Sequence, residues 1–181
     1  MAFFLWTAAH GQILTLDNLM LRGHSLANQC CKCYNGESVN HLLIHCPVVH
    51  SLWVFMLQVF GVQWVMLGSV AGLLFCWHHW LGNHTSDIWN LIPSCLMWIV
   101  WLERNHCSFE DTEKTLEELK VLCQRNLFYW SRCRGFTDCS SLSEFRLSLR
   151  IASWFLFLCC LFMFTCVHHH EQLVFFLSFH Q

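Results

Sequence analysis

The sequence predicts a mainly α fold. Apolar residues recur every three or four positions in several segments of the 181-residue chain, and no segment shows the two-residue alternation of a half-buried strand. Only two prolines and eight glycines interrupt these segments. The hydrophobic fraction of 55% and the charged fraction of 12% exclude a disordered chain and provide ample material for a core.

The first part of the chain contains four segments with helical spacing. They are Phe3–Ala9, Asn18–Arg22, Val39–His45 and Pro47–Phe60. Thr15 or Asp17 can cap the second segment and Ser38 the third, because their side-chain oxygens accept hydrogen bonds from the free N–H groups of a helix start. Pro47 suits the first position of the fourth segment, and Gly61 can end it.

The spacing of apolar residues in the middle of the chain predicts three further helices. They are Val70–Trp80, which would stop near Gly82, then Asp87–His106 and Glu113–Tyr129. Pro93 should kink the second of these or break it in two, because proline lacks an N–H group and clashes with the preceding turn. Asp111 or Thr112 is the expected cap of the third, with Glu113 in its first turn.

Four residues between two predicted helices have the spacing of a metal site. Cys30, Cys33, His41 and Cys46 form the pattern C-x2-C-x7-H-x4-C. Zinc takes four such ligands in a tetrahedron, and a C-x2-C turn can place two thiolates on one ion. Asn35 and Gly36 supply a turn that would bring the second pair back. We therefore expect helices around a small Cys3His loop that binds a structural zinc ion.

Two alternatives exist for these cysteines. Thiols also pack as small hydrophobic groups, and a chain with thirteen cysteines and thirteen histidines produces some matches by chance. A redox C-x-x-C motif usually follows a strand in a βαβ unit, and no such context is visible. The odd cysteine count lacks the rhythm of a secreted scaffold, so we expect an intracellular protein, nuclear or cytoplasmic.

The distribution of carboxylates argues against catalysis. Two-metal nucleotidyl transfer needs clustered carboxylates. The aspartates are scattered along the chain, at Asp17, Asp87, Asp111 and Asp138. Phosphate-binding glycine loops and the G-x-S-x-G elbow are absent from the sequence. We expect no enzyme and no small-molecule substrate.

The last 31 residues differ from the rest of the chain. Glu171 is their only formally charged residue. The segment Ile151–Val167 has no formal charge, and its 17 residues are at the lower length limit of a membrane-spanning helix. Arg146 and Arg150 precede this segment, so a spanning helix would leave the body in the cytosol. The tail is either an apolar C-terminal helix of the fold or the anchor of a small tail-anchored membrane protein with a cytosolic helical body.

Several separated motifs resemble a known family. FFLWTAAHGQILTLDNLMLRG is followed by the C-x2-C pair, by GESVNHLLIHCPVVHSLW and by a W-x-x-W-x-E-R-N signature at Trp98–Asn105. Together they resemble the zinc-binding domain of plant non-LTR (LINE-type) retrotransposon reverse transcriptases, over roughly residues 3 to 149. The resemblance implies the same four metal ligands and a role in gripping RNA or DNA. Cys107 stands where the family usually has a basic residue, as in a decaying fragment of a retroelement.

The expected nucleic-acid contacts are few. The formal net charge of −2 gives no global attraction for phosphate. Arg22 and Lys32 are the cations near the expected site, Tyr34 could stack on a base, and Arg104 is added by the resemblance. Residues 125–150 add a mild patch of five arginines against two acidic residues. We divide the chain into a zinc-binding domain (1–110), a helical extension (111–150) and a hydrophobic tail (151–181).

Overall fold

The computed structural model describes residues 2–62, 65–77 and 86–149, and this part of the chain is helical without strands. The mainly α prediction is confirmed. The elements are α1 (Ala2–Ala9), α2 (Leu16–Leu21), the π-helix η1 (His41–His45), α3 (Pro47–Val59), α4 (Val70–Trp77), α5 (Ser86–Glu110) and α6 (Leu116–Cys133). Residues 142–149 form one more short helix.

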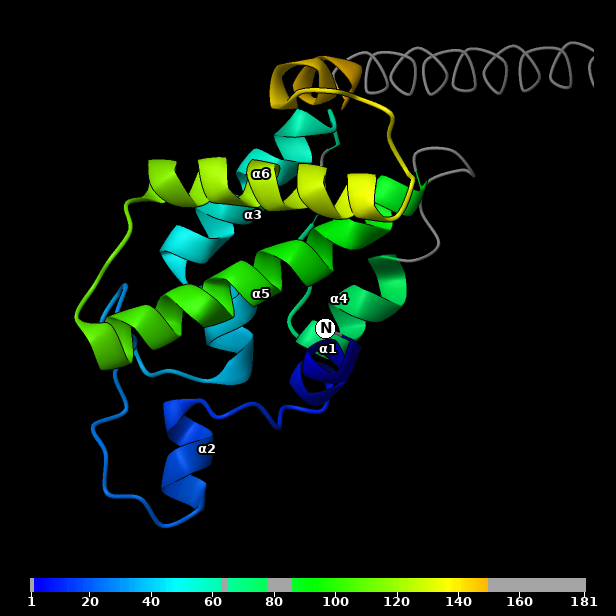
Figure 1. The fold of residues 1–181 in the computed structure, drawn as a ribbon. Helices are drawn as coiled ribbons and strands as arrows, with labels where there is room; N and C mark the ends of the chain where they lie inside the picture. Colours follow the sequence, from blue (N-terminus) through cyan, green and yellow to red (C-terminus); the bar gives the residue numbers. More distant parts are fainter. Residues whose placement is uncertain (1, 63–64, 78–85, 150–181) are drawn as a thin grey trace, which may run out of the picture.

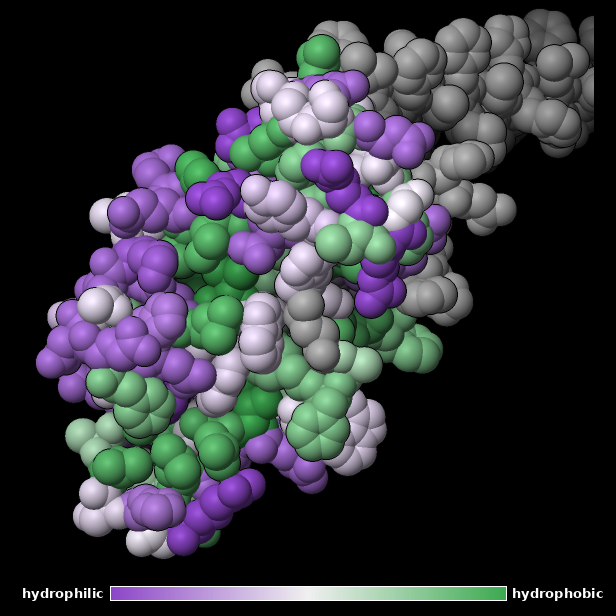
Figure 2. Space-filling view, in the orientation of Figure 1, coloured by the Kyte–Doolittle hydropathy of each residue, from purple (hydrophilic) through white to green (hydrophobic). Residues whose placement is uncertain are grey.

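Helices α5 and α6 form the centre of the fold. They run antiparallel as a hairpin, and α3 packs against both of them (Figure 1). The π-helix η1 lies against α3 and α5, while α1 packs on α4 and α5. This arrangement sets the cysteine-bearing loop beside the second half of α5. Hydrophilic side chains cover the side where α5 ends and α6 begins (Figure 2).

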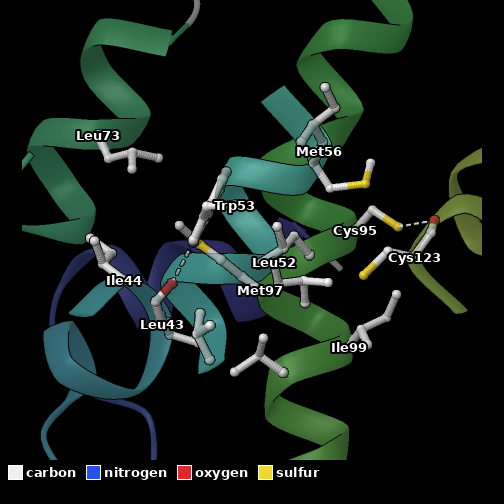
Figure 3. Packing of buried hydrophobic residues seen from close by; sticks show 14 of the residues in the cluster. Leu43, Ile44, Leu52, Trp53, Met56, Leu73, Cys95, Met97, Ile99 and Cys123 are labelled. Carbon is white, nitrogen blue, oxygen red and sulfur yellow. Dashed lines mark hydrogen bonds between the residues drawn. The ribbon is translucent and has the colours of Figure 1, made fainter. Parts of the chain in front are cut away.

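The core lies where α3 crosses α5, and Figure 3 shows Leu52 and Met56 reaching into it. Two core thiols also meet there, and the Sγ atom of Cys95 donates a hydrogen bond to the carbonyl oxygen of Cys123 at 3.6 Å. Burial raises the pKa of Cys123 to about 12 and raises the pKa of Cys95 as well. Both thiols therefore stay neutral and pack as small hydrophobic groups.

The predicted kink or break at Pro93 is wrong, because α5 continues through it as one helix. Proline cannot donate to the carbonyl four residues earlier, which here belongs to Trp89. The indole Nε1 of Trp77 donates to that carbonyl at 3.1 Å, and the two tryptophan rings stack with centroids 4.3 Å apart. A side chain from α4 thus replaces the backbone donor that Pro93 lacks.

The chain's other proline, Pro47, lies at the first position of α3, where its missing N–H costs no helical hydrogen bond. A second indole bonds to a backbone carbonyl just before it, that of Leu43 in η1. The indole Nε1 of Trp53 donates to this carbonyl at 2.9 Å (Figure 3). Trp53 is fully buried, so its hydrogen bond joins η1 to α3 inside the core.

The cap predicted for the last long helix is also wrong. Helix α6 begins at Leu116, so Glu113 lies in the preceding connection rather than in the first turn. Its cap is Thr115, whose hydroxyl accepts from the Glu118 N–H while the Glu118 carboxylate accepts from the Thr115 N–H. This reciprocal pair, and neither Asp111 nor Thr112, satisfies the free donors at the helix start.

Several predictions concern residues outside the described ranges. The expected helix end at Trp80 and Gly82 lies there, as does the apolar tail with its candidate membrane segment Ile151–Val167. Within the described ranges, no helix combines the length and the apolar character needed to cross a bilayer. The division at residue 110 stays a prediction, and α6 packs directly on α5 and α3.

Candidate metal centre

The four predicted ligands meet in space. The ligand atoms of Cys30, Cys33, His41 and Cys46 all lie within 4.8 Å of one another. The Sγ atom of Cys33 lies 3.1 Å from the Nε2 atom of His41. In a tetrahedral zinc site, ligand sulfurs stand about 3.8 Å apart, given a zinc–sulfur bond of about 2.3 Å. Three sulfurs and one imidazole at these separations fit a single divalent ion.

A tight turn places the first two cysteines. The N–H of Cys30 donates to the carbonyl of Asn35 at 2.7 Å, and the N–H of Tyr34 donates to the carbonyl of Cys30 at 2.9 Å. Tyr34 adopts the left-handed conformation, with φ of 62°. The sequence suggested that Asn35 and Gly36 would make the reversal. The left-handed residue is instead Tyr34, a position that costs strain in a non-glycine residue.

The wide turn of η1 places the second pair. Ser38 caps this segment as predicted, since its hydroxyl accepts from the N–H of His41 at 3.2 Å. The N–H of Cys46 then reaches back five residues to the carbonyl of His41 at 2.7 Å. Such π-turns are rare and occur frequently at functional sites. Here the turn keeps His41 and Cys46 on the side that faces the first pair.

The geometry favours Cys30 over its neighbour Cys31 as a ligand, because the Sγ atom of Cys30 belongs to the four-residue cluster and that of Cys31 does not. Hydrogen bonds from the Cys31 and Cys46 side chains hold the pKa of Cys30 far below its ordinary value. The contact with Cys30 raises the pKa of Cys31 strongly, so Cys31 stays a neutral thiol. The same contact raises the pKa of Cys46. A divalent cation at the centre would take the place of the proton that Cys46 shares with Cys30.

Lys32 ties the turn to α5. Its Nζ atom lies 2.8 Å from Oε1 of Glu103 and 3.0 Å from Oε1 of Glu113. Glu103 also accepts from the N–H of Lys114 at 2.6 Å. Burial alone would lower the pKa of Lys32 and raise that of Glu103. The hydrogen bonds between them reverse both directions, so both groups are charged.

Glu37 and Arg104 make a second link on the other side of the loop. The guanidinium Nη2 of Arg104 lies 2.9 Å from Oε1 of Glu37, and its Nε atom contacts both carboxylate oxygens. The side chains are 3% and 1% exposed, so the pair is shielded from water. Glu37 also accepts from the N–H of Leu16 at the start of α2, and Arg104 lies over the ring of Trp101.

These ion pairs involve two of the four residues predicted to contact nucleic acid. Lys32 and Arg104 are buried and paired with carboxylates, so neither presents its charge to a phosphate. Arg22 and Tyr34 lie on the surface, and Tyr34 is 74% exposed. Glu103 and Arg104, the E-R dipeptide of the signature, therefore hold the loop between Cys30 and Cys46, called the metal loop below, against α5.

Glu37 is the site residue that sequence reasoning missed. Its partner Arg104 lies 67 positions away, so no local pattern joins them. The available signal was an acidic residue followed at once by a helix cap, Ser38, in a segment where exposed charges were few. That local signal does not identify Arg104 as the partner of Glu37, which only the fold shows.

Comparison with known proteins agrees with this geometry. Residues 1–53 match the protein family described as zinc-binding in reverse transcriptase. A search of curated proteins and a search of solved structures found no match. All four candidate ligands lie inside the matched segment, which ends at Trp53. The resemblance is confirmed at this level: residues 1–53 are similar to the family described as zinc-binding in reverse transcriptase.

Proposed function

We propose that this chain is a non-catalytic module with a structural zinc ion, and that it binds RNA or DNA as a fragment of a LINE-type retroelement. The observation that carries the proposal is the convergence of Cys30, Cys33, His41 and Cys46 within the segment that matches the family. The family description concerns zinc binding, which supports a role other than catalysis.

The character of the ligand set supports a structural ion. Structural zinc sites use four protein ligands, whereas catalytic sites keep one position for water or substrate. Cys30 and Cys46 are fully buried, so little room remains for a substrate on that side. Two buried ion pairs, Lys32–Glu103 and Glu37–Arg104, already hold the loop between Cys30 and Cys46, and the free energy of zinc binding would add to the folding free energy of this loop.

The side chains around the ion would make the nucleic-acid contacts. Three thiolates and one Zn²⁺ give the cluster a net charge of −1, which repels phosphate. The attraction must therefore come from exposed groups such as Arg22, and Tyr34 offers an exposed ring for base stacking. With so few free cations near the loop, we expect weak binding with little sequence preference.

A salt titration tests the nucleic-acid role. Fluorescein-labelled single-stranded 12-mers of RNA and DNA would be titrated with the full, zinc-loaded chain, and binding followed by fluorescence anisotropy. We expect the affinity of the wild-type chain to fall as the salt concentration rises. At a fixed salt concentration, Tyr34→Ala should bind more weakly than the control Tyr129→Ala, which removes another exposed tyrosine. Affinity that ignores both salt and the removal of zinc by a chelator would refute the proposal.

A further inference from the structure

A cleft on the side of α1, α5 and α6 is separate from the metal centre. Its volume is about 500 Å³, and none of the four metal ligands lines it. The walls come from the start of α1, the first half of α5 and the end of α6. Ligand pockets usually measure roughly 300 to 1,000 Å³, so the space suits a group as large as a nucleotide.

One wall of the cleft combines aromatic rings with a cation. Trp130 and Phe136 line it, and both are half-buried. Arg134, between them in sequence, is exposed and forms no ion pair with any residue that the structure describes. Its guanidinium is thus available for a phosphate, in contrast to Lys32 and Arg104. Aromatic rings beside such a cation are the usual elements of single-strand binding.

The part of the lining that comes from α5 carries groups that can distinguish bases. Asp87 and Asn90 project from the first turns of α5 into the lining of the cleft. A carboxylate accepts hydrogen bonds from an exocyclic amino group, such as N4 of cytosine, and repels the carbonyl that uracil has there. An amide can pair with the Watson–Crick edge of an unstacked base.

We propose that this cleft binds one nucleotide of a single-stranded nucleic acid, with its phosphate on Arg134 and the amino edge of its base on Asp87. The inference rests on the proposed function, because it names a second contact surface for the same ligand. Cytosine is favoured over uracil at this position.

A row of rings lies on α1, the helix that contributes Ala2 and Leu5 to the cleft. Phe3 and Trp6 are stacked with centroids 6.3 Å apart, and His10 lies 4.4 Å from Trp6. Phe3 and Trp6 are 76% and 54% exposed, while the opposite face of α1 is buried through Phe4 and Ala8. The neighbouring nucleotides of the strand stack along this row.

The first test measures the salt dependence of binding. Fluorescein-labelled C12 and U12 RNA would be titrated with the zinc-loaded full chain, with Arg134→Gln, and with Lys120→Gln as the control. Lys120 is a cation of α6 that lies outside the cleft and outside the arginine patch, and it pairs with Glu117. We expect Arg134→Gln alone to reduce the slope of log K against log salt by about one. Arg134→Lys should restore the slope. Equal slopes in Arg134→Gln and Lys120→Gln, with binding retained, would overturn the cleft proposal and leave the proposed function intact.

The second test measures base preference. The wild-type chain should bind C12 more tightly than U12, and Asp87→Asn should reduce that ratio. Trp6→Ala should weaken the binding of both oligomers more than Phe109→Ala, which removes an even more exposed ring at the far end of α5. A C12-to-U12 ratio unchanged by Asp87→Asn counts against the cleft. Failure of the wild-type chain to bind either oligomer would overturn the proposed function and the cleft together.

Discussion

Arg104 on α5 contacts both carboxylate oxygens of Glu37, the residue that follows the metal-binding turn. The same carboxylate accepts the N–H of Leu16, so one buried anion joins the metal loop, α2 and α5. The neighbouring Glu103 holds Lys32 inside the turn itself. The metal loop is therefore fixed at two points by consecutive residues of one helix.

Removal of Arg104 should destabilise the protein strongly. Arg104→Met leaves the Glu37 carboxylate buried without its cation, and breaking a buried pair in this way costs about 3–5 kcal/mol. Urea unfolding of the zinc-loaded chain, followed by circular dichroism, measures the free energy of unfolding. The double variant Glu37→Gln/Arg104→Met removes both charges and should recover part of the loss. A single variant as stable as the wild type would contradict the structural role of the pair.

Glu103→Gln should have a smaller effect. Lys32 would lose one carboxylate but keep the exposed one of Glu113, at 3.0 Å. We expect Glu103→Gln to lower the free energy of unfolding by less than Arg104→Met, and Lys32→Met to restore part of it. Because Lys32 lies within the C-x2-C turn, zinc affinity should fall as well, measured by competition with a chromogenic chelator. An effect larger than that of Arg104→Met would show that we have ranked the two links incorrectly.

The hydrogen bond between Trp77 and the carbonyl of Trp89 should depend on Pro93. Trp77→Phe keeps a ring but loses the indole donor, which leaves a buried carbonyl unsatisfied at a cost of about 1–3 kcal/mol. In a Pro93→Ala background the helix supplies its own N–H, so the same change should cost less. Urea unfolding of the four proteins of this double-mutant cycle gives the coupling energy. Zero coupling would mean that the indole does not replace the proline's missing donor.

Thr115→Ala should weaken the start of α6. The change removes the hydroxyl that accepts from the Glu118 N–H, and loss of such a cap costs about 1 kcal/mol. Thr112→Ala is the matched control, because Thr112 was the cap expected from the sequence and lies outside the helix. If thermal unfolding shows equal effects of the two substitutions, the cap assignment is wrong.

The sequence was informative where the signal is local. The spacing of Cys30, Cys33, His41 and Cys46 predicted a set of residues that the fold brings together, and the helical segments predicted before residue 130 agree with the described helices to within a few residues. The short helix at 142–149 was not predicted. The T-x-x-E signature of the true cap, Thr115 with Glu118, is also local, and it competes with the nearby cap residues Asp111 and Thr112.

Sequence reasoning failed where the partner is distant. Pro93 looks like a break until Trp77 of another helix supplies the missing donor. Lys32 and Arg104 look like phosphate ligands until the fold brings buried carboxylates 71 and 67 positions away against them. Local patterns record the charge of a side chain, and only the tertiary structure shows whether that charge is already neutralised.

The zinc content of the purified chain tests the central claim most directly. We predict one zinc ion per chain by elemental mass spectrometry, a loss of that ion in Cys33→Ser, and full content in the control Cys139→Ser, which removes a similarly half-buried thiol outside the cluster. A wild-type chain without bound zinc, or Cys33→Ser with the wild-type content, would contradict the account.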